Sequence, residues 1–370
     1  MTDSANILFR LLRAALGVET GVSLPDDVDW NEVVDLAFEQ GVAAMLVDGL
    51  DKATKTILRQ AQESTKTEEL DFLESEELED LRYELFGEAL ACEEDYAKHL
   101  EAIRYLADIW ASEGLYAFAL KGIAFARYYP VPAHRYSCDF DCNVRSREGN
   151  LPAWEKADQV VRGNGIEVDS SMSKHSRYVV NGISVENHRS IIGVNGSRKR
   201  KRFDAYLQEL LQPSEENLLK GAGVYAPCWL FDALFYTEHA RVHFIDEEGI
   251  SIKHVLDWVQ IRKAPEADRY REQFEKDIDR FGLRKFFDAL DGVADYVMGV
   301  RGELSEAQKR MLEDILAKKN VRHFDSRLLV YLNILRTLWK NRWKYKLYSE
   351  TTFLATVWRY VYGHLFDRKI

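Results

Sequence analysis

The chain has 370 residues and a formal net charge of −11, and these two properties limit what kind of protein it can be. Hydrophobic residues make up 46% and charged residues 30% of the sequence, which is typical of a globular protein that folds in water. No uninterrupted apolar run approaches the roughly 20 residues of a membrane helix, so we expect no membrane partner. The acidic charge argues against binding DNA over the whole surface. The length predicts two or three domains.

The four cysteines are too few and too scattered for a disulfide framework. Cys138 and Cys142 could form half of a zinc site, but on a strand they share a face with Phe140, which favours two small core residues. The N-terminus carries an acidic residue at Asp3 and lacks a clean cleavage site, so we interpret it as a helix. These features predict a cytoplasmic protein.

The first part of the chain has apolar residues near helical spacing. Trp30 to Ala53 predicts two short helices, and the acidic stretch Glu63 to Asp80 also has a helical pattern. Leu81 to Ser112 predicts one long amphipathic helix or two, with Gly87 as the expected interruption. We therefore place an N-terminal helical region at residues 1–95.

The pattern changes after residue 112 to one that predicts a small β-sheet. Leu115 to Gly122 is short, apolar and aromatic, which indicates a buried strand followed by a turn. Ile123 to Pro130 fits a short helix, and Cys138 to Val144 alternates polar and apolar residues like a second strand. Leu151 to Arg162 predicts a helix, and Ile166 to Val168 a further short strand.

The dipeptide Asn181-Gly182 predicts a β-hairpin between Arg177 to Val180 and Ile183 to His188. A type I′ turn needs positive φ at both central positions, which asparagine and glycine tolerate best. A two-residue loop makes the residues pair outward from the turn, with Val180 opposite Ile183. One face then carries the core residues Tyr178, Val180, Ile183 and Val185.

The opposite face of this hairpin is polar. It places Glu186 directly across from Arg177, and it adds His175 and His188 if the pairing extends that far. A simple cross-strand ion pair between Glu186 and Arg177 is one interpretation of this face, and a functional carboxylate is the other.

From about Phe203 onward the chain has helical periodicity, and no repeat of fixed period is evident. The fold class that we expect is α+β, with a small mixed β-sheet flanked by helical regions at both ends. We place the α/β core at residues 96–205 and a C-terminal helical domain at 206–370. The candidate helices of this domain are 231–242, 252–261, 270–281, 284–298, 306–317 and 326–339.

Asp139 and Asp141 lie two residues apart on the second predicted strand and therefore share one face with Asn143. Two carboxylates roughly 7 Å apart along a strand repel each other unless a cation lies between them. Mg²⁺ is commonly held by one or two carboxylates together with substrate phosphates. An isolated D-x-D pair is usually solvated surface, so its context decides the interpretation.

That context is a turn in which a helix follows directly from a strand. The free N–H groups at such a helix start suit a phosphate, and Gly122 stands at this position. Lys121 precedes it and could add a positive charge. Arg135 could bind phosphate or could equally be a structural partner of a helix end.

In chain order, these blocks resemble the uncharacterised bacterial nucleotidyltransferase family of the DNA polymerase β-like superfamily. The pattern of that family is roughly L-K-G, a tyrosine and proline, R-x-x-x-D-h-D-h-h-V, and h-E-x-H. The resemblance covers most of residues 30–262. The matching residues are Leu120-Lys121-Gly122, Tyr129-Pro130, Arg135, Asp139 to Val144, and Val185 to His188.

The resemblance implies transfer of a nucleoside monophosphate from an NTP, ATP included, to an acceptor hydroxyl. It implies two metal ions, usually Mg²⁺ (or Mn²⁺), held by Asp139, Asp141 and Glu186, with Glu186 a candidate to take the acceptor proton. The candidates for nucleotide binding are Lys121, Gly122, Arg135 and His188. Residues of the C-terminal helices that are candidates to line the cleft are His239, His243, His254 and Asp257.

Two other functions stay open at this point. One is a non-catalytic binding module that retains the fold; the other is a toxin-like nucleotidyltransferase that acts on tRNA or protein. The basic runs Ser197 to Arg202 and Leu338 to Tyr345 motivate the second. The acceptor is therefore a small molecule, tRNA or protein. The separation of the three acids distinguishes the enzyme from the non-catalytic binding module, since carboxylates more than about 8 Å apart could not share the ions of a two-metal site.

Overall fold

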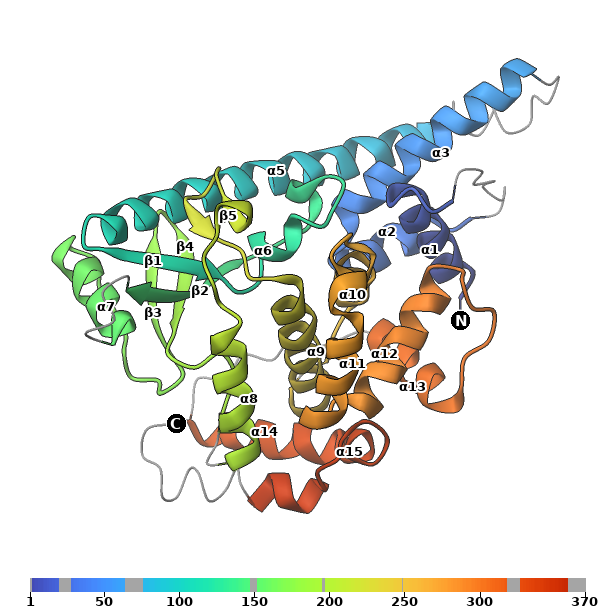
Figure 1. Cartoon of the computed structure of the whole chain (residues 1–370). Helices are drawn as coiled ribbons and strands as arrows, with labels where there is room; N and C mark the ends of the chain where they lie inside the picture. Colours follow the sequence, from blue (N-terminus) through green and yellow to red (C-terminus); the bar gives the residue numbers. More distant parts are fainter. Residues whose placement is uncertain are drawn as a thin grey trace.

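The computed structural model describes residues 2–19, 28–63, 76–146, 152–194, 197–247, 249–317 and 327–358. A six-stranded mixed sheet lies between a long helix and a group of C-terminal helices (Figure 1). The expected α+β class, with helical regions at both ends of the chain, is confirmed. Among the described residues, no helix is long and apolar enough to cross a lipid bilayer.

The N-terminal helices pack against each other through an apolar core. They are α1 (Asp3–Ala15), α2 (Trp30–Glu39) and α3 (Ala43–Glu63). The side chains of Thr2 and Asp29 cap the first two helices by accepting a backbone N–H, as the N-cap position favours. Leu8, Leu12 and Leu46 are fully buried between these elements.

The long helix α5 (Glu76–Ala111) runs without interruption, so of the two alternatives the single helix is confirmed and Gly87 causes no break. Glycine costs a helix interior about 1 kcal/mol relative to alanine. Burial of Leu85, Ala89 and Cys92 around this position outweighs that cost. The helix expected over residues 63–80 lies mostly outside the described residues, and its last part belongs to α5.

The strand order of the sheet is β3-β4-β2-β1-β6-β5. The central strand β2 pairs antiparallel with β1 and parallel with β4, which confirms a mixed sheet. The hairpin of β3 and β4 forms one edge. The strands are β1 (Leu115–Ala119), β2 (Asp139–Ser146), β3 (His175–Val180), β4 (Ile183–His188), β5 (Leu218–Leu219) and β6 (Val224–Tyr225).

One expected strand is absent, and two short strands were not expected. Ile166 to Val168 forms no strand, and the segment before β3 contributes a single bridge from Asp169 to Arg177. The strands β5 and β6 were not expected, because two residues are too few to show a period of two. They extend the sheet beyond β1.

One face of the sheet is apolar and is covered by α5 and α7 (Ala153–Gly163). Phe140, Cys142 and Val144 of β2 are buried there with side chains of both helices. The expectation that two cysteines share this core is right for Cys142 and wrong for Cys138, which is exposed because β2 begins one residue later. Asp139, like Asp141, therefore belongs to the opposite face.

The opposite face is covered by the C-terminal helices, which lie on the other side of the sheet from α5 (Figure 1). The six candidate helices expected from residue 231 onward are all present, with α8 as an addition before them. The helices are α8 (Arg198–Glu209), α9 (Trp229–Asp246), α10 (Ile252–Lys263), α11 (Ala267–Phe281), α12 (Arg284–Val297), α13 (Glu306–Leu316), α14 (Arg327–Lys340) and α15 (Arg342–Tyr348).

The elements do not divide at the boundaries that we placed on the sequence. The helix α5 continues through residue 95, and β5 and β6 follow residue 205. The division into regions 1–95, 96–205 and 206–370 therefore remains a proposal about folding units.

Candidate active site

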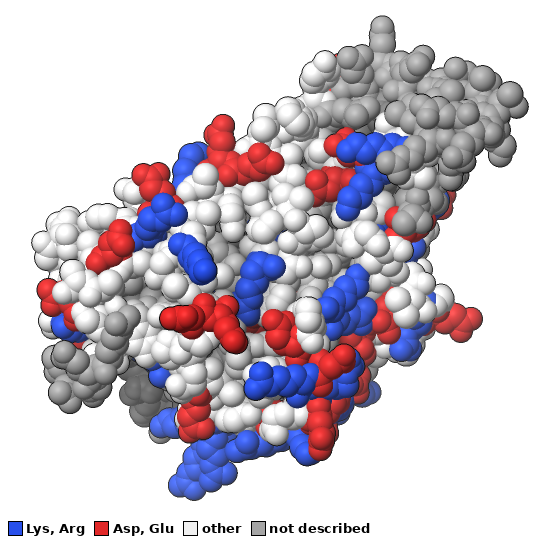
Figure 2. All heavy atoms as spheres, turned by 45° about the horizontal axis from the view of Figure 1, so that its top comes forward, with Lys and Arg blue, Asp and Glu red and all other residues white. Residues whose placement is uncertain are grey.

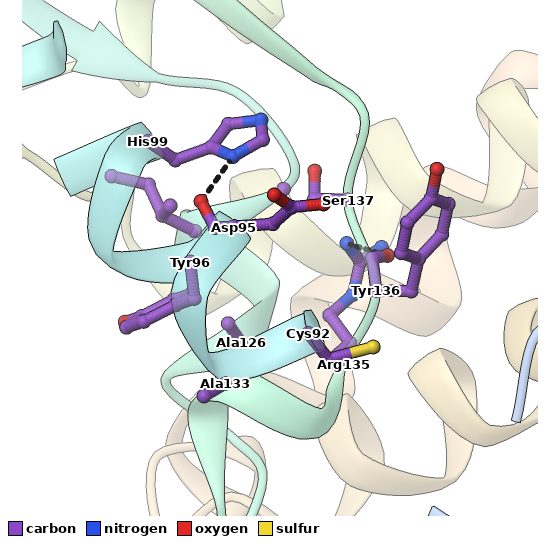
Figure 3. Close-up of a pocket in the computed structure, with 11 residues that line it drawn as sticks. Cys92, Asp95, Tyr96, His99, Ala126, Ala133, Arg135, Tyr136 and Ser137 are labelled. Carbon is purple, nitrogen blue, oxygen red and sulfur yellow. Dashed lines mark hydrogen bonds between the residues drawn. The ribbon is translucent and has the colours of Figure 1, made fainter. Parts of the chain in front are cut away.

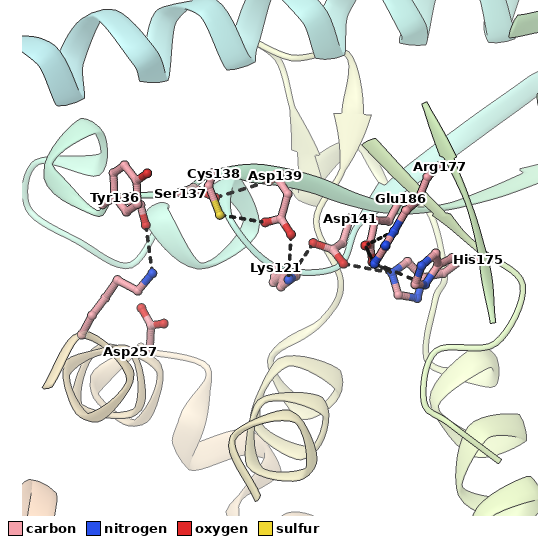
Figure 4. A network of polar contacts seen from close by, with 12 residues as sticks. Lys121, Tyr136, Ser137, Cys138, Asp139, Asp141, His175, Arg177, Glu186 and Asp257 are labelled. Atoms are coloured by element: carbon pink, nitrogen blue, oxygen red, sulfur yellow. Dashed lines mark hydrogen bonds and ion pairs between the residues drawn. The ribbon is translucent and has the colours of Figure 1, made fainter. Parts of the chain in front are cut away.

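Lys121 lies between the two aspartates of the D-x-D motif (Figure 4). Its Nζ atom is 3.2 Å from Oδ2 of Asp139 and 3.0 Å from Oδ2 of Asp141. Burial opposes the charged form of Lys121, but the two carboxylates raise its pKa above the usual value. Burial likewise opposes the charged form of Asp141, but Lys121 and His188 hold the pKa of this carboxyl well below its usual range. A lysine ammonium thus balances the charge that a metal ion would balance.

The register of the hairpin is as expected. All six predicted pairs are present, from Val180 opposite Ile183 at the turn to His175 opposite His188. Asn181 and Gly182 have φ values of 50° and 81°, so both central residues adopt positive φ as a type I′ turn requires.

Glu186 lies on β4 between polar residues of the two adjacent strands. It is paired with Asp141 of β2 on one side and with Arg177 of β3 on the other. Its Oε1 atom accepts from Nε and Nη2 of Arg177 at 2.9 and 2.7 Å. Its Oε2 atom is 3.4 Å from Nε2 of His188 and 3.4 Å from Nδ1 of His175. Burial opposes ionisation of Glu186, but His188 in particular lowers its pKa to about 2.

His188 joins the two halves of the site. Its Nε2 atom is 2.9 Å from Oδ1 of Asp141 as well as close to Glu186. Because Asp141 and Glu186 contact one nitrogen, and Asp139 and Asp141 contact one ammonium, each of these pairs of acids lies within the limit of about 8 Å for a two-metal site. The cross-strand pair of Glu186 and Arg177 is real, and it coexists with this cluster.

Gly122 forms the sharp turn between β1 and α6 (Ile123–Ala126). Its φ of 61° is in the region that favours glycine, and an added Cβ atom would come within 2.8 Å of Oγ of Ser137. The structure therefore accepts only glycine here without distortion. The helix that follows is a single turn, shorter than the sequence suggested, so the helix dipole contributes little at this point.

Arg135 is not directed at this cluster. It follows the 3₁₀ turn η1 (Pro132–His134) and is buried against Asp257 of α10. Its Nε and Nη2 atoms donate to the two carboxylate oxygens at 2.9 and 2.7 Å, and Tyr129 donates to the same carboxylate at 2.8 Å. Of the two interpretations of Arg135, this contact favours the structural one.

Behind the hairpin, Asp158 of α7 supports the site, and we did not identify it from the sequence. It accepts hydrogen bonds from Ser176 at 2.5 Å and from Asn187 at 3.0 Å, and all three side chains are buried. A signal was available, since Ser176 and Asn187 are polar residues on the otherwise apolar face of the hairpin. Such residues require a buried partner.

Histidine and lysine side chains approach the cluster from the other elements around it. Burial lowers the pKa of Lys174 and, strongly, that of His239 on α9; the positive charge of Lys121 lowers both further. His239 and His243 have ring centroids 4.3 Å apart. Of the predicted cleft histidines, His239 and His243 lie on α9 and His254 lies on α10, whereas Asp257 is occupied by Arg135.

A separate pocket lies on the α5 side of Gly122 (Figure 3). It has an empty volume of about 290 Å³, and α5 contributes Cys92, Asp95 and Tyr96 to its lining. His99 points toward its own helix, where its Nδ1 atom donates to the carbonyl oxygen of Asp95 at 2.8 Å. None of the carboxylates of the D-x-D motif lines this pocket.

The surface charge is mixed rather than concentrated. Figure 2 shows acidic and basic side chains interspersed over one face. Of the basic run on α8, Arg200 pairs with Glu238 at 2.7 Å and Lys199 with Glu350 at 3.1 Å. Arg198, Lys201 and Arg202 are exposed. Part of this run is therefore structural, and only its exposed members could attract a charged substrate.

A sequence model of a family described as an uncharacterised nucleotidyltransferase matches residues 26–299. The chain belongs to this family. The match confirms the expectation of an uncharacterised nucleotidyltransferase family, and it includes the whole sheet, the acidic cluster and helices as far as α12. The family's description supports a role in nucleotidyl transfer in general terms. Searches of curated proteins and of solved structures found no match.

Proposed function

We propose that the protein is a metal-dependent nucleotidyltransferase of the DNA polymerase β-like type, which transfers an NMP group from an NTP to an acceptor hydroxyl. The observation that carries this proposal is that Asp139, Asp141 and Glu186 lie on one face of the sheet and are linked through common partners. Lys121 contacts both aspartates, and His188 contacts Asp141 and Glu186. Membership of a nucleotidyltransferase family supports it. The placement in that superfamily rests on the order of the motifs.

The carboxylates fit divalent metal ions. They supply hard oxygen ligands from adjacent strands, and the cation that Oδ2 of Asp141 now contacts is the ammonium of Lys121 at 3.0 Å. Asp139, Asp141 and Glu186 would hold the ions. Bound Mg²⁺ or Mn²⁺ would lower the pKa of the acceptor hydroxyl and neutralise charge on the triphosphate.

The other residues of the chain would bind and position the substrates. Gly122 lets the backbone approach the phosphates. Lys121 now pairs with the two aspartates, and when metal ions neutralise these acids its ammonium would pair with a phosphate oxygen. Arg135 holds α10 in place through Asp257 and acts as a positioning residue. In the reaction, the acceptor oxygen bonds to the α-phosphorus, the bond from that phosphorus to the bridging oxygen breaks, and pyrophosphate leaves. The acceptor proton passes to bulk water, because contacts with both oxygens of Glu186 keep its pKa at about 2 and make it a weak base.

Calorimetric titration of the purified protein with each NTP tests this proposal. We expect binding in the presence of Mg²⁺ or Mn²⁺, and at least tenfold weaker binding in excess chelator or in Asp139→Asn and Glu186→Gln variants. Asp268→Asn, at an exposed residue of α11, is the matched control and should bind like the wild type. NTP binding that is absent, or that is independent of metal, would contradict the proposal.

The second step uses NTPs labelled on the α-phosphate, which is the group that is transferred. Incubation with total RNA, with protein from a lysate and with a small-molecule fraction shows which class receives the label. Metal-dependent NTP binding without transfer to any of these would favour a binding module. Label in RNA or protein would favour the toxin-like function, and label confined to small molecules would eliminate it.

A further inference from the structure

Two histidines and a glutamate converge beside the D-x-D motif. Nδ1 of His175 and Nε2 of His188 are each 3.4 Å from Oε2 of Glu186. Within the described parts of the chain, these three residues form a group whose ligand atoms all lie within 4.8 Å of one another. Ligand atoms of a tetrahedral ion with bonds of about 2.1 Å are separated by about 3.4 Å. The spacing is therefore that of a metal site.

His175 has no hydrogen-bond partner for either ring nitrogen within the described structure. Its side chain is only 5% exposed, so water does not replace the missing partners. A buried polar group without a partner is costly. Its ring is directed toward Glu186 in Figure 4 and is tilted by 49° from the ring of His188, so stacking does not explain its position. An ion held by this imidazole would explain it.

Neighbouring groups fix the orientation that such an ion needs. Arg177 holds Oε1 of Glu186 and leaves Oε2 facing the two imidazoles. In the ion-bound form, Nδ1 of His188 would donate to the carbonyl oxygen of Ser190, 3.3 Å away, and Nε2 would present its lone pair to the ion. Carbonyl and charged partners of this kind commonly set the tautomer of a metal-binding histidine.

We propose that His175, Glu186 and His188 form a site for a divalent transition metal such as Zn²⁺. Imidazole ligands favour this ion, whereas Mg²⁺ favours oxygen ligands and water. The site deepens the proposed function, because it shares Glu186 with the acidic cluster. It is distinct from the position between Asp139 and Asp141, where Lys121 supplies the positive charge.

Titration of chelator-treated, full-length protein with Co²⁺ tests the site, since this ion reports its ligands by visible absorption. We expect one equivalent to bind, at least 100-fold more tightly than Mg²⁺ in competition. His175→Gln and His188→Gln should each weaken Co²⁺ binding at least tenfold. His99→Gln is the matched control, because His99 lies on α5 and its Nδ1 atom donates to the carbonyl oxygen of Asp95 at 2.8 Å. This control should bind Co²⁺ like the wild type.

Thermal unfolding separates loss of the ion from loss of the fold. In chelator, His175→Gln should unfold at the wild-type temperature or above it, because it removes an unpartnered imidazole; with Co²⁺ only the wild type should gain stability. Equal Co²⁺ affinity in the wild type and both glutamine variants, or equal affinity for Co²⁺ and Mg²⁺, would overturn the proposal. Absence of Mg²⁺-dependent NTP binding alongside an intact Co²⁺ site would remove the proposed function and leave this site standing.

Discussion

At the scale of single residues, the arrangement of Lys121 is the most informative feature of the site. Its ammonium contacts both aspartates, one of which is only 3% exposed. Removing one partner of a buried ion pair leaves the other charge uncompensated, at a cost of about 3–5 kcal/mol when both are buried. Lys121 is 20% exposed, so the cost here belongs at the lower end of that range.

We therefore expect Lys121→Met to destabilise the protein by about 3 kcal/mol in chelator, with a partial recovery in Mg²⁺. The recovery follows because the ion can compensate the two carboxylates in place of the ammonium. The measurement is the thermal midpoint of each variant with and without Mg²⁺. The double variant with Asp139→Asn is the control and should be less destabilised than Lys121→Met alone. A midpoint of Lys121→Met that does not respond to Mg²⁺ would contradict this account.

The sequence predicted these residues better than it predicted their contacts. Alternation along a strand placed Asp139 and Asp141 on one face, and the turn placed Glu186 opposite Arg177, because both relations are local. The pair of Arg135 and Asp257 joins residues separated by 122 positions, so no local pattern reveals it. Asp158 is likewise distant in sequence from its partners, and the local sign of it was the polar pair Ser176 and Asn187 on an otherwise apolar face.

At the scale of elements, two glycines differ in how well a local sequence pattern predicts the structure around them. Gly182 has a φ of 81° in the hairpin turn, where a side chain is strained. Gly87 lies within α5, has no positive φ, and an added Cβ atom there would meet nothing within 4 Å. The turn follows from backbone sterics alone, and it was predicted. The continuity of α5 depends on tertiary burial, so the sequence left one helix and two helices as alternatives.

Replacement of these glycines by alanine should have opposite effects. Gly182→Ala should destabilise the protein by about 1–2 kcal/mol, because alanine resists the left-handed conformation. Since β4 carries Glu186, the same variant should also weaken metal-dependent NTP binding. Gly87→Ala, the matched control, should stabilise the protein by about 0.5–1 kcal/mol. The measurements are thermal midpoints and NTP titrations, and a Gly182→Ala variant as stable as the wild type would show that the turn is not under this constraint.

At the scale of the whole molecule, the segment around η1 joins the three regions of the chain. His134 contacts Asp48 of α3 and Glu93 of α5, and the next residue, Arg135, binds Asp257 of α10. The order of helices, sheet and helices was evident from the sequence. The way in which they meet was not, because it depends on single charged residues far apart in the chain. This junction sits between β1 and β2, the strands that carry Lys121 and the aspartates, so it fixes the site relative to both helical regions.

The His134 contacts should make the stability of the protein depend on pH. Nδ1 lies 2.8 Å from Oδ2 of Asp48, and Nε2 lies 3.2 Å from Oε1 of Glu93, so both ring nitrogens face carboxylates. The hydrogen bond to Asp48 is the main cause that raises the pKa of His134 above its ordinary value of 6.5, against the effect of burial. A raised pKa in the folded state means that the folded protein binds the proton more tightly than the unfolded chain. The stabilisation is therefore complete below pH 6.5 and is lost as the pH rises through the raised value.

We expect His134→Gln to cost about 2 kcal/mol at pH 6, as charge-assisted hydrogen bonds commonly contribute, and much less at pH 9. The coupling energy of His134 with Asp48 should also be larger at pH 6 than at pH 9. It is measured from the thermal midpoints of His134→Gln, Asp48→Asn and the double variant. Glu93 is half-exposed, so Glu93→Gln should change the stability less than Asp48→Asn does. A coupling of equal size at pH 6 and pH 9 would mean that the imidazole is neutral in the junction, and that packing rather than charge holds the N-terminal helices against the strands that carry the site.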